Sequence, residues 1–299
     1  MSASPGFSSW EEAVQWLRAQ PERRDLILNA YYDDPLVEAA RRYWRGDEWT
    51  AIRALLGGAR GEALDLGAGR GIASYALARE GFTVTALEPD SSAIVGAGAI
   101  RALAASEDLH IRVVQDLGEC LPFARESFAL AFGRAVMHHM RDLGATCREV
   151  FRVLKPGGRF VVVREHVISR RADLAAFLAK HPLHHLYGGE NAFLLGEYIG
   201  ALESAGFLVQ RVIRPFDSPI NYYPHTRETL REEMVRRAGR LQGASRLLDR
   251  LLRIETNLSV TLKLLSIFSR RPGLLYSFVC DKPGLANRRG RSIGGRPTC

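Results

Sequence analysis

The chain has few cysteines for its 299 residues, and their spacing argues against two kinds of structure. Cys120, Cys147, Cys280 and Cys299 lie far apart and form no C-x-x-C pair. A disulfide framework needs a regular set of cysteines, and a cysteine-based zinc site needs such a pair. We therefore expect neither of them.

Membrane and export signals are also missing from the sequence. No stretch reaches eighteen consecutive apolar residues, which is about the length that spans a bilayer. The N-terminus carries Trp10, Glu11 and Glu12 where a secretion signal would have a basic region followed by an apolar one. These absences predict a cytoplasmic protein.

The composition is that of a folded domain with an excess of positive charge. With 46% hydrophobic and 25% charged residues, the chain is long enough to bury a large core, so we expect one elaborated domain. The formal charge of +8 raises the question of a nucleic-acid partner. Much of the excess, however, lies in a Gly-rich tail, residues 285–299, which we expect to be disordered. We therefore expect a small-molecule partner and no nucleic acid.

The most informative stretch is Ala63–Gly71, an apolar run that ends in three glycines spaced two apart. The run is typical of a buried parallel strand, and Ile72–Arg79 after it has helical character. Glycine permits a sharp turn and lets backbone N–H groups approach a ligand, and the helix N-terminus then favours an anionic group. Gly67, Gly69 and Gly71 read G-x-G-x-G, whereas the dinucleotide fingerprint is G-x-G-x-x-G.

This motif, with Asp65 inside the strand end, resembles motif I of the class I S-adenosylmethionine-dependent methyltransferases. The resemblance covers about residues 60 to 215. It has one departure, because the family usually has Phe-Asp at the start of the fourth strand, where this chain has Phe128-Ala129. The further markers follow in the family's order and spacing: Glu88 after the strand Phe82–Leu87, Asp116 after the strand Ile111–Gln115, Leu121-Pro122-Phe123, the strand Ser127–Phe132 and the turn Leu154-Lys155-Pro156-Gly157-Gly158.

The resemblance implies S-adenosylmethionine as the cofactor and S-adenosylhomocysteine as its product. It implies that the glycine loop holds the methionine part, that Glu88 accepts the ribose hydroxyls, and that Asp116 lies beside the adenine. The predicted cofactor residues are Asp65, Gly67, Ala68, Gly69, Gly71, Glu88, Pro89, Asp116, Leu117, Arg134 and Tyr31.

Residues 1–58 form a predicted helical lid. Between its helices, Asn29–Pro35 is a polar and aromatic turn. In related methyltransferases the segment before the first strand closes over the cofactor, so we expect Tyr31 or Tyr32 to cover the methionine end or the substrate. The alternative is a tyrosine packed on the edge of the sheet.

Catalytic residues are expected after the fourth strand, because ligands of an open α/β sheet lie beyond the carboxyl ends of its strands. His138 and His139 occupy this place. The pair is similar to that of many small-molecule methyltransferases, among them the phosphobase enzymes, in which a histidine at the position of His139 helps to deprotonate the acceptor. Those enzymes also have an aspartate four residues earlier, where this chain has Ala135. We predict His139 as the base, since histidine titrates near neutrality, with His138 and His184 as further candidates or as structural residues.

A second polar cluster follows the fifth strand, Arg159–Arg164. It contains four of the eight histidines, three of them within five positions. No cysteine lies nearby and Pro182 breaks the helical spacing of a metal-binding pair, so we predict no metal. We expect a substrate-binding loop, or else a loop whose polar groups satisfy its own backbone. With residues from other segments, the predicted substrate contacts are Tyr32, Glu165, His166, His185, Glu190, Asn191, Tyr222 and Tyr223.

Residues 215–272 are a predicted insertion between the sixth strand, Phe207–Arg214, and the last strand, Leu274–Cys280. Apolar residues surround most of its helix Ile254–Phe268, so this helix must bury its surface. We expect it to form a cap over the active site. Contact with a second subunit in a homodimer and contact with a membrane are the alternatives.

The sequence thus predicts an α/β fold with a doubly wound sheet of seven strands in the order 3-2-1-4-5-7-6, the last strand antiparallel. Its Rossmann-like core comprises residues 59–214 and 273–284. The predicted function is transfer of a methyl group from S-adenosylmethionine to oxygen, nitrogen or carbon of a small metabolite or natural-product intermediate. The alternatives are a methyltransferase for RNA or protein and a non-catalytic protein that binds S-adenosylmethionine.

Overall fold

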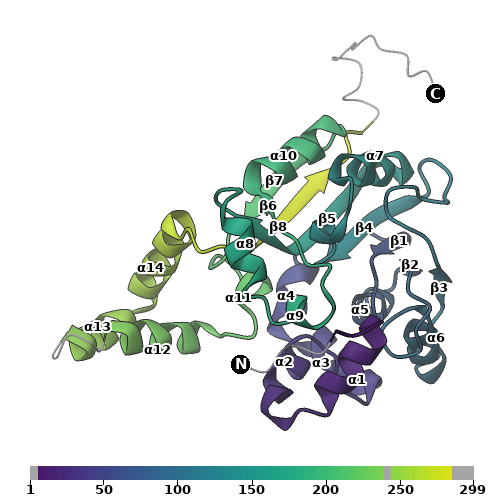
Figure 1. Cartoon of the computed structure of the whole chain (residues 1–299). Coiled ribbons are helices and arrows are strands. Elements are labelled where there is room, and N and C mark those ends of the chain that lie inside the picture. Colours follow the sequence, from purple (N-terminus) through teal and green to yellow (C-terminus); the bar gives the residue numbers. More distant parts are fainter. Residues whose placement is uncertain (1–5, 239–243, 285–299) are drawn as a thin grey trace.

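The computed structural model describes residues 6–238 and 244–284 of the chain. One sheet lies at its centre, and helices cover both faces (Figure 1). The expected disorder of the tail, residues 285–299, concerns residues outside the described ones.

The sheet has the order β3-β2-β1-β4-β5-β8-β7, and the short β6 pairs with β5 off this path. Strand β8 is antiparallel to both β5 and β7, and the other pairs are parallel. The predicted order is confirmed, because β6 only shifts the numbering of the last two strands by one. The strands are β1 (Glu62–Leu66), β2 (Thr83–Leu87), β3 (Ile111–Val114), β4 (Phe128–Arg134), β5 (Leu154–Ile168), β6 (Phe193–Leu194), β7 (Leu208–Ile213) and β8 (Leu274–Asp281).

Each face of the sheet has its own apolar core, because successive strand residues point to opposite sides. In β1, Ala63 packs with the helices of one face and Leu64 with those of the other. Helices α3, α4 and α5 cover the first face, and α7 and α10 cover the second (Figure 1). The helices are α1 (Trp10–Arg18), α2 (Arg24–Asn29), α3 (Leu36–Arg45), α4 (Asp47–Arg53), α5 (Ile72–Arg79), α6 (Ala97–Ser106), α7 (Leu143–Val153), α8 (Asp173–Leu178), α9 (His184–Tyr187), α10 (Leu195–Ser204), α11 (Pro219–Tyr222), α12 (Arg227–Ala238), α13 (Ala244–Leu252) and α14 (Glu255–Phe268), with the 3-10 turns η1 (Pro21–Arg23) and η2 (Met137–His139).

Strand β5 contains a bulge that matters for the site. Its register with β8 shifts between Val162 and Glu165, and Arg164 there has φ of +63°, in the left-handed region. A bulge re-aims the side chains next to it. It leaves Arg164 facing the N-terminal helices and Glu165 facing the backbone of η2.

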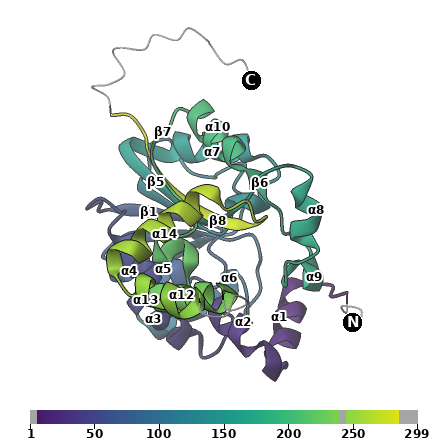
Figure 2. The same ribbon diagram turned by 90° about the vertical axis from the view of Figure 1, so that its left-hand side faces the viewer.

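Helices α12, α13 and α14 form an arm that extends away from the sheet (Figure 1) and faces the viewer in Figure 2. Leu258 and Leu262 of α14 are buried against α11 and α12, but Phe268 is 68% exposed. The structure therefore differs from the expected cap, because the arm leaves part of its apolar surface in solvent. Residues 239–243, between α12 and α13, are not among the described ones. Among the helices that the structure describes, none is long and apolar enough to cross a bilayer.

Candidate active site

The glycine loop joins β1 to α5 with a backbone that glycine adopts most easily. Gly67, Gly69 and Gly71 have φ values of +62°, +54° and +83°. A Cβ atom on Gly67 would lie 2.1 Å from Cγ2 of Val136, so this position is closed to other residues. A Cβ atom on Gly69 would have no neighbour within 4 Å, and Gly69 lines a cavity.

This cavity has a volume of about 660 Å³ and lies at the carboxyl ends of β1, β2, β3 and β4. Its size is within the range of roughly 300–1,000 Å³ that is typical of small-molecule sites, and its place is that of ligands in open α/β sheets. The predicted site residues that line it are Asp65, Gly67, Ala68, Gly69, Glu88, Pro89, Asp116, Leu117, Arg134, Tyr31, Tyr32, His139 and Glu190.

Two carboxylates, after the ends of β2 and β3, line the cavity. Glu88 accepts hydrogen bonds from the backbone N–H groups of Gly69, at 2.7 Å, and Asp90, at 3.0 Å. Each of its oxygens keeps a lone pair for a ligand, and burial raises the pKa of this carboxyl group. Asp116 accepts from the N–H of Leu117 at 2.8 Å and also lines the cavity.

Asp65 is the buried acid of the loop. Its side chain accepts a hydrogen bond of 2.6 Å from the hydroxyl of Ser74, and the residue is 1% exposed. Burial is the main cause that raises the pKa of Asp65 to about 7, with the charge of Glu88 adding to it and Ser74 opposing it. Asp65 therefore gains its negative charge near neutral pH, inside a cavity expected to hold a cationic cofactor.

This titration leads to a prediction about pH. Below its pKa Asp65 is neutral, and above it the carboxylate attracts the sulfonium and ammonium groups of S-adenosylmethionine. The ratio of the dissociation constants of Asp65→Asn and the unaltered protein should therefore rise about tenfold between pH 6 and 8, which is about 1.4 kcal/mol. Calorimetric titration of both proteins measures this ratio, and ionisation of the ligand itself cancels in it. A ratio that does not change with pH would contradict the assignment.

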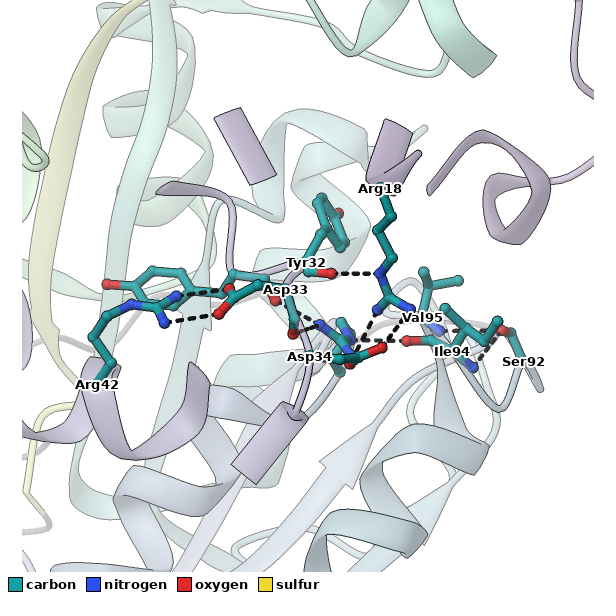
Figure 3. Close-up of polar contacts among 10 residues, drawn as sticks. Arg18, Tyr32, Asp33, Asp34, Arg42, Ser92, Ile94 and Val95 are labelled. Atoms are coloured by element: carbon teal, nitrogen blue, oxygen red, sulfur yellow. Dashed lines mark hydrogen bonds and ion pairs between the residues drawn. The ribbon is translucent and has the colours of Figure 1, made fainter. Parts of the chain in front are cut away.

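Arg70 of the glycine loop ties the N-terminal lid to the core, and Figure 3 shows the residues around it. Its Nη1 donates to the backbone oxygens of Tyr31 and Asp33, both at 2.9 Å, and its Nη2 forms an ion pair with Asp34. Its Nε donates to the oxygen of Ile94 at 2.8 Å. One buried guanidinium thus joins the lid turn, the glycine loop and the segment after β2.

Two further arginines hold the same turn (Figure 3). Arg18 of α1 donates to the backbone oxygen of Tyr32 at 2.6 Å and pairs with Asp34 at 2.6 Å. Arg42 of α3 forms two hydrogen bonds with Asp33, at 2.7 and 2.8 Å. The aromatic turn therefore has a fixed position above the glycine loop.

Replacing Arg70 with methionine should loosen this lid. We expect about tenfold weaker binding of S-adenosylmethionine and faster proteolytic cleavage within the N-terminal helices, because the turn loses its link to the core. Calorimetry and limited proteolysis measure the two effects. Arg101→Met is the matched control, since Arg101 is exposed on α6 and contacts Gln115. Equal behaviour of the two variants would show that Arg70 does not hold the lid.

Aromatic side chains form the roof of the cavity. Tyr31 is 2% exposed and stacks on Tyr223, with ring centroids 5.9 Å apart. Trp10 of α1 donates to the hydroxyl of Tyr32 at 3.2 Å, and its ring lies 6.0 Å from that of Tyr187 in α9. The predicted covering role is consistent with these positions, and α9 completes the roof.

A buried ion cluster lies beneath Tyr31. Glu48 of α4 is fully buried and pairs with Arg134 at the end of β4, with contacts of 2.7 and 3.1 Å. Arg164, in the bulge of β5, lies 4.0 Å from the same carboxylate. Burial lowers the pKa of Arg134, but the charge of Glu48 outweighs it and raises the pKa. The cluster joins the lid helices to two central strands.

The histidine pair is held from behind by Glu165. This buried carboxylate accepts from the backbone N–H groups of Val136, Met137 and His138 at 3.0, 3.1 and 3.0 Å. It also accepts from Nδ1 of His138 at 2.7 Å. Burial lowers the pKa of His138, but the charges of Glu165 and Glu190 outweigh it and raise the pKa to about 9. Glu165 thus fixes η2 and does not reach the cavity.

His139 faces the cavity. Its Nδ1 lies 2.9 Å from the backbone oxygen of Gly189, and because a carbonyl oxygen only accepts, Nδ1 carries the hydrogen. In the neutral ring the lone pair is therefore on Nε2. The cavity wall around the ring partly desolvates it, and this desolvation together with the neighbouring His138 lowers the pKa of His139. Glu190, also in the cavity wall, has its pKa raised by burial but lowered more strongly by three histidines, to about 2.

Several predicted residues do not line the cavity. His166 lies behind His138, with Nδ1 at 3.1 Å from the oxygen of Gly273. Tyr222 packs against the helical arm. The sequence pattern did not show to which side the side chains of these residues point. The predicted catalytic and substrate residues outside the cavity wall are His138, His184, Glu165, His166, His185, Asn191, Tyr222 and Tyr223.

Other important residues were not predicted as site residues. Arg70 stands between two loop glycines, where the motif accepts any residue. Glu48 is 86 residues from its partner Arg134, so no local pattern indicates the pair. Trp10 and Tyr187 meet only because α1 packs on α9.

Comparison with known sequences identifies the domain. Residues 64–162 match the family described as "Methyltransferase domain". The ubiquinone biosynthesis O-methyltransferase of Methylobacterium nodulans is 33% identical over 150 residues, which are 49% of this chain and 59% of that protein. The chain thus spans less than two thirds of the length of this relative.

Solved structures share the fold. The geranyl diphosphate C-methyltransferase of Streptomyces coelicolor A3(2) has a TM-score of 0.58 at 14% identity, covering 93% of this chain and 99% of that one. The [4+2]-cyclase SpnF has a TM-score of 0.53 at 18% identity, covering 82% of this chain and 81% of that one. At such identities the likeness shows the fold alone.

The chain contains a methyltransferase domain at residues 64–162. Its strand order and its glycine loop are those of the class I S-adenosylmethionine-dependent methyltransferase fold.

Proposed function

We propose that this chain transfers a methyl group from S-adenosylmethionine to a small organic molecule. The observation that carries the proposal is the single cavity that joins the glycine loop and Glu88 to His139 and Glu190. When bound, S-adenosylmethionine supplies a methyl group already activated on a sulfonium centre. The residues of the chain then have to orient the acceptor and exclude water, and the lid held by Arg70 serves the second task.

We propose a lipophilic acceptor with an oxygen-bearing group. The aromatic rings of Trp10, Tyr32 and Tyr187 lie in the same cavity wall as the polar side chains of His139 and Glu190. The named relative acts in ubiquinone biosynthesis, and the named structural neighbour methylates geranyl diphosphate on carbon. Methylation on oxygen or carbon of such a molecule fits this mixture of apolar and polar groups.

His139 is the residue that we propose activates the acceptor. In the neutral ring, Nε2 of His139 carries a free lone pair. Among the described residues, His139 is the histidine that lines the cavity. Nitrogen acceptors that begin uncharged need no such group, whereas hydroxyl and enol acceptors do.

The test uses S-adenosylmethionine labelled with ¹³C in the methyl group, incubated with the full chain and separated small-molecule, RNA and protein fractions of a cell extract. We expect the label in a small-molecule product detected by mass spectrometry, with loss of the signal in the Gly69→Arg variant. Label in RNA or protein would instead support a macromolecular acceptor. Binding of the cofactor without any labelled product would favour a different reaction on the same fold. The structural neighbour SpnF, which is named a [4+2]-cyclase, is an example of such a difference.

A further inference from the structure

His138, His139 and Glu190 converge beside the cavity, with one ligand atom of each lying within 4.8 Å of the others. We propose that these three residues hold a divalent transition-metal ion, whose open coordination positions bind an oxygen atom of the acceptor. The inference rests on the proposed function for its acceptor. It changes the way in which His139 acts, from direct proton removal to binding an ion that lowers the acceptor's pKa.

The hydrogen bonds of the two imidazoles leave the correct atoms free. Nδ1 of His138 donates to Glu165 at 2.7 Å, and Nδ1 of His139 donates to the backbone oxygen of Gly189 at 2.9 Å. A ligating histidine nearly always donates its other N–H to a carboxylate or carbonyl, which fixes the tautomer and the ring orientation. Both rings therefore direct Nε2 to a metal ion, which would displace the Nε2 proton that His138 carries in its charged form. Glu165 and Gly189 are the supporting acceptors.

The spacing fits shared ligation better than a direct hydrogen bond. Nε2 of His138 and Oε2 of Glu190 are 3.5 Å apart, beyond the optimum of about 2.7–3.2 Å for N–H···O. Two ligands at about 2.0–2.1 Å from a tetrahedral ion lie roughly 3.4 Å from each other. The rings of His138 and His139 are adjacent, with centroids 4.2 Å apart. A small shift of the Glu190 loop would bring all three ligand atoms to one ion.

The chemistry of the three ligands defines the class of ion. Two imidazoles and one carboxylate suit zinc, manganese or iron in the divalent state, whereas magnesium prefers oxygen ligands. Three protein ligands leave positions open, as in catalytic rather than structural sites. His139 and Glu190 line the cavity, so these positions face the place proposed for the acceptor.

The proposed step is a simple proton balance. The oxygen of an acceptor hydroxyl or enol binds the ion, its O–H bond breaks, and the proton leaves to water. The electron pair stays on oxygen, which becomes a better nucleophile at neutral pH. No oxidant or reductant takes part.

A second group of residues competes for the same carboxylate. His166, His181 and Glu190 also have ligand atoms within 4.8 Å of one another. Nδ1 of His181, however, accepts the backbone N–H of His184 at 3.3 Å, so in the neutral ring the hydrogen is on Nε2, which faces Glu190. This tautomer does not suit metal binding. The sequence analysis predicted no metal because it considered only the histidines at positions 181–185. Two of the three ligands proposed here, His138 and His139, lie in η2 instead.

The test is a titration of the full chain, freed of metal by a chelator, with Co²⁺. We expect one equivalent to bind with visible absorption bands, and at least tenfold weaker binding in His139→Ala and in Glu190→Gln. His110→Ala is the matched control, because His110 is an exposed histidine remote from the cavity lining, and it should bind Co²⁺ as the unaltered chain does.

The contradicting results are equally specific. Absence of saturable Co²⁺ binding overturns the proposal, as does binding that His139→Ala retains and His166→Ala or His181→Ala abolishes. Titration with S-adenosylmethionine separates the two proposals. If the unaltered chain binds S-adenosylmethionine but not Co²⁺, the metal site alone is overturned. If it binds Co²⁺ but not S-adenosylmethionine, the proposed function is overturned.

Discussion

Replacing Gly69 with arginine is expected to weaken binding of S-adenosylmethionine at least a hundredfold, which corresponds to about 2.7 kcal/mol. The position of a Cβ atom on Gly69 is open, and the residue borders the cavity. A long side chain there fills the space of the cofactor and brings a positive charge beside its sulfonium group. Calorimetric titration measures the loss.

Gly81→Arg is the matched control for this variant. Gly81, in the turn before β2, has φ of +88° and also has no atom within 4 Å of a Cβ position, so both variants carry a similar backbone strain. Gly81 does not line the cavity. We expect normal cofactor binding by Gly81→Arg, and equal losses in the two variants would mean that the effect comes from strain.

Removing the charge of Glu48 should cause the largest loss of stability. In Glu48→Gln, the buried guanidinium groups of Arg134 and Arg164 lose their carboxylate, and breaking a buried ion pair from one side costs about 3–5 kcal/mol. We expect a decrease of this size in the free energy of unfolding, measured with urea.

Glu38→Gln is the surface control for Glu48→Gln. Glu38 pairs with Arg41 in α3, and its side chain is 58% exposed, so its loss should change stability by less than about 1 kcal/mol. A double variant, Glu48→Gln with Arg134→Met, should recover part of the loss, because it removes one of the two unpaired charges. Equal stability of Glu48→Gln and Glu38→Gln would contradict the importance of the buried cluster.

The core of the fold was predictable because its signals are local. The apolar run before Gly67 and the order of later markers such as Glu88 and Asp116 lie within short segments, and the strand order follows from them. Glu88 and Asp116 line the same cavity as the glycine loop, and their contact with the cofactor stays a prediction. Gly67 and Gly71 have positive φ, which glycine adopts most easily. The glycines at these positions therefore predict the turn between β1 and α5 from the sequence alone.

The acceptor end was predicted less well, because its geometry depends on contacts between distant segments. Glu165 was expected to bind substrate, yet the bulge in β5 aims it at the backbone of η2. Glu190 reaches the cavity, whereas its neighbour Asn191 does not line it. A sequence pattern gives the residue types of such a loop but not which of them face inward.

The helical arm illustrates a different limit. The apolar surface of α14 indicated burial, and part of it, including Leu258, is buried. Phe268 and other apolar residues of the arm stay exposed. Hydrophobicity alone showed that the helix has an apolar surface, but it did not show where the arm projects.

The most direct test of the central claim is calorimetric titration of the unaltered chain with S-adenosylhomocysteine, the product expected at this site. The cavity over the glycine loop predicts saturable binding at a single site with a micromolar dissociation constant, about −8 kcal/mol. It also predicts an increase in the melting temperature with ligand concentration. Absence of both saturable binding and a thermal shift at millimolar ligand would contradict the assignment of the cavity.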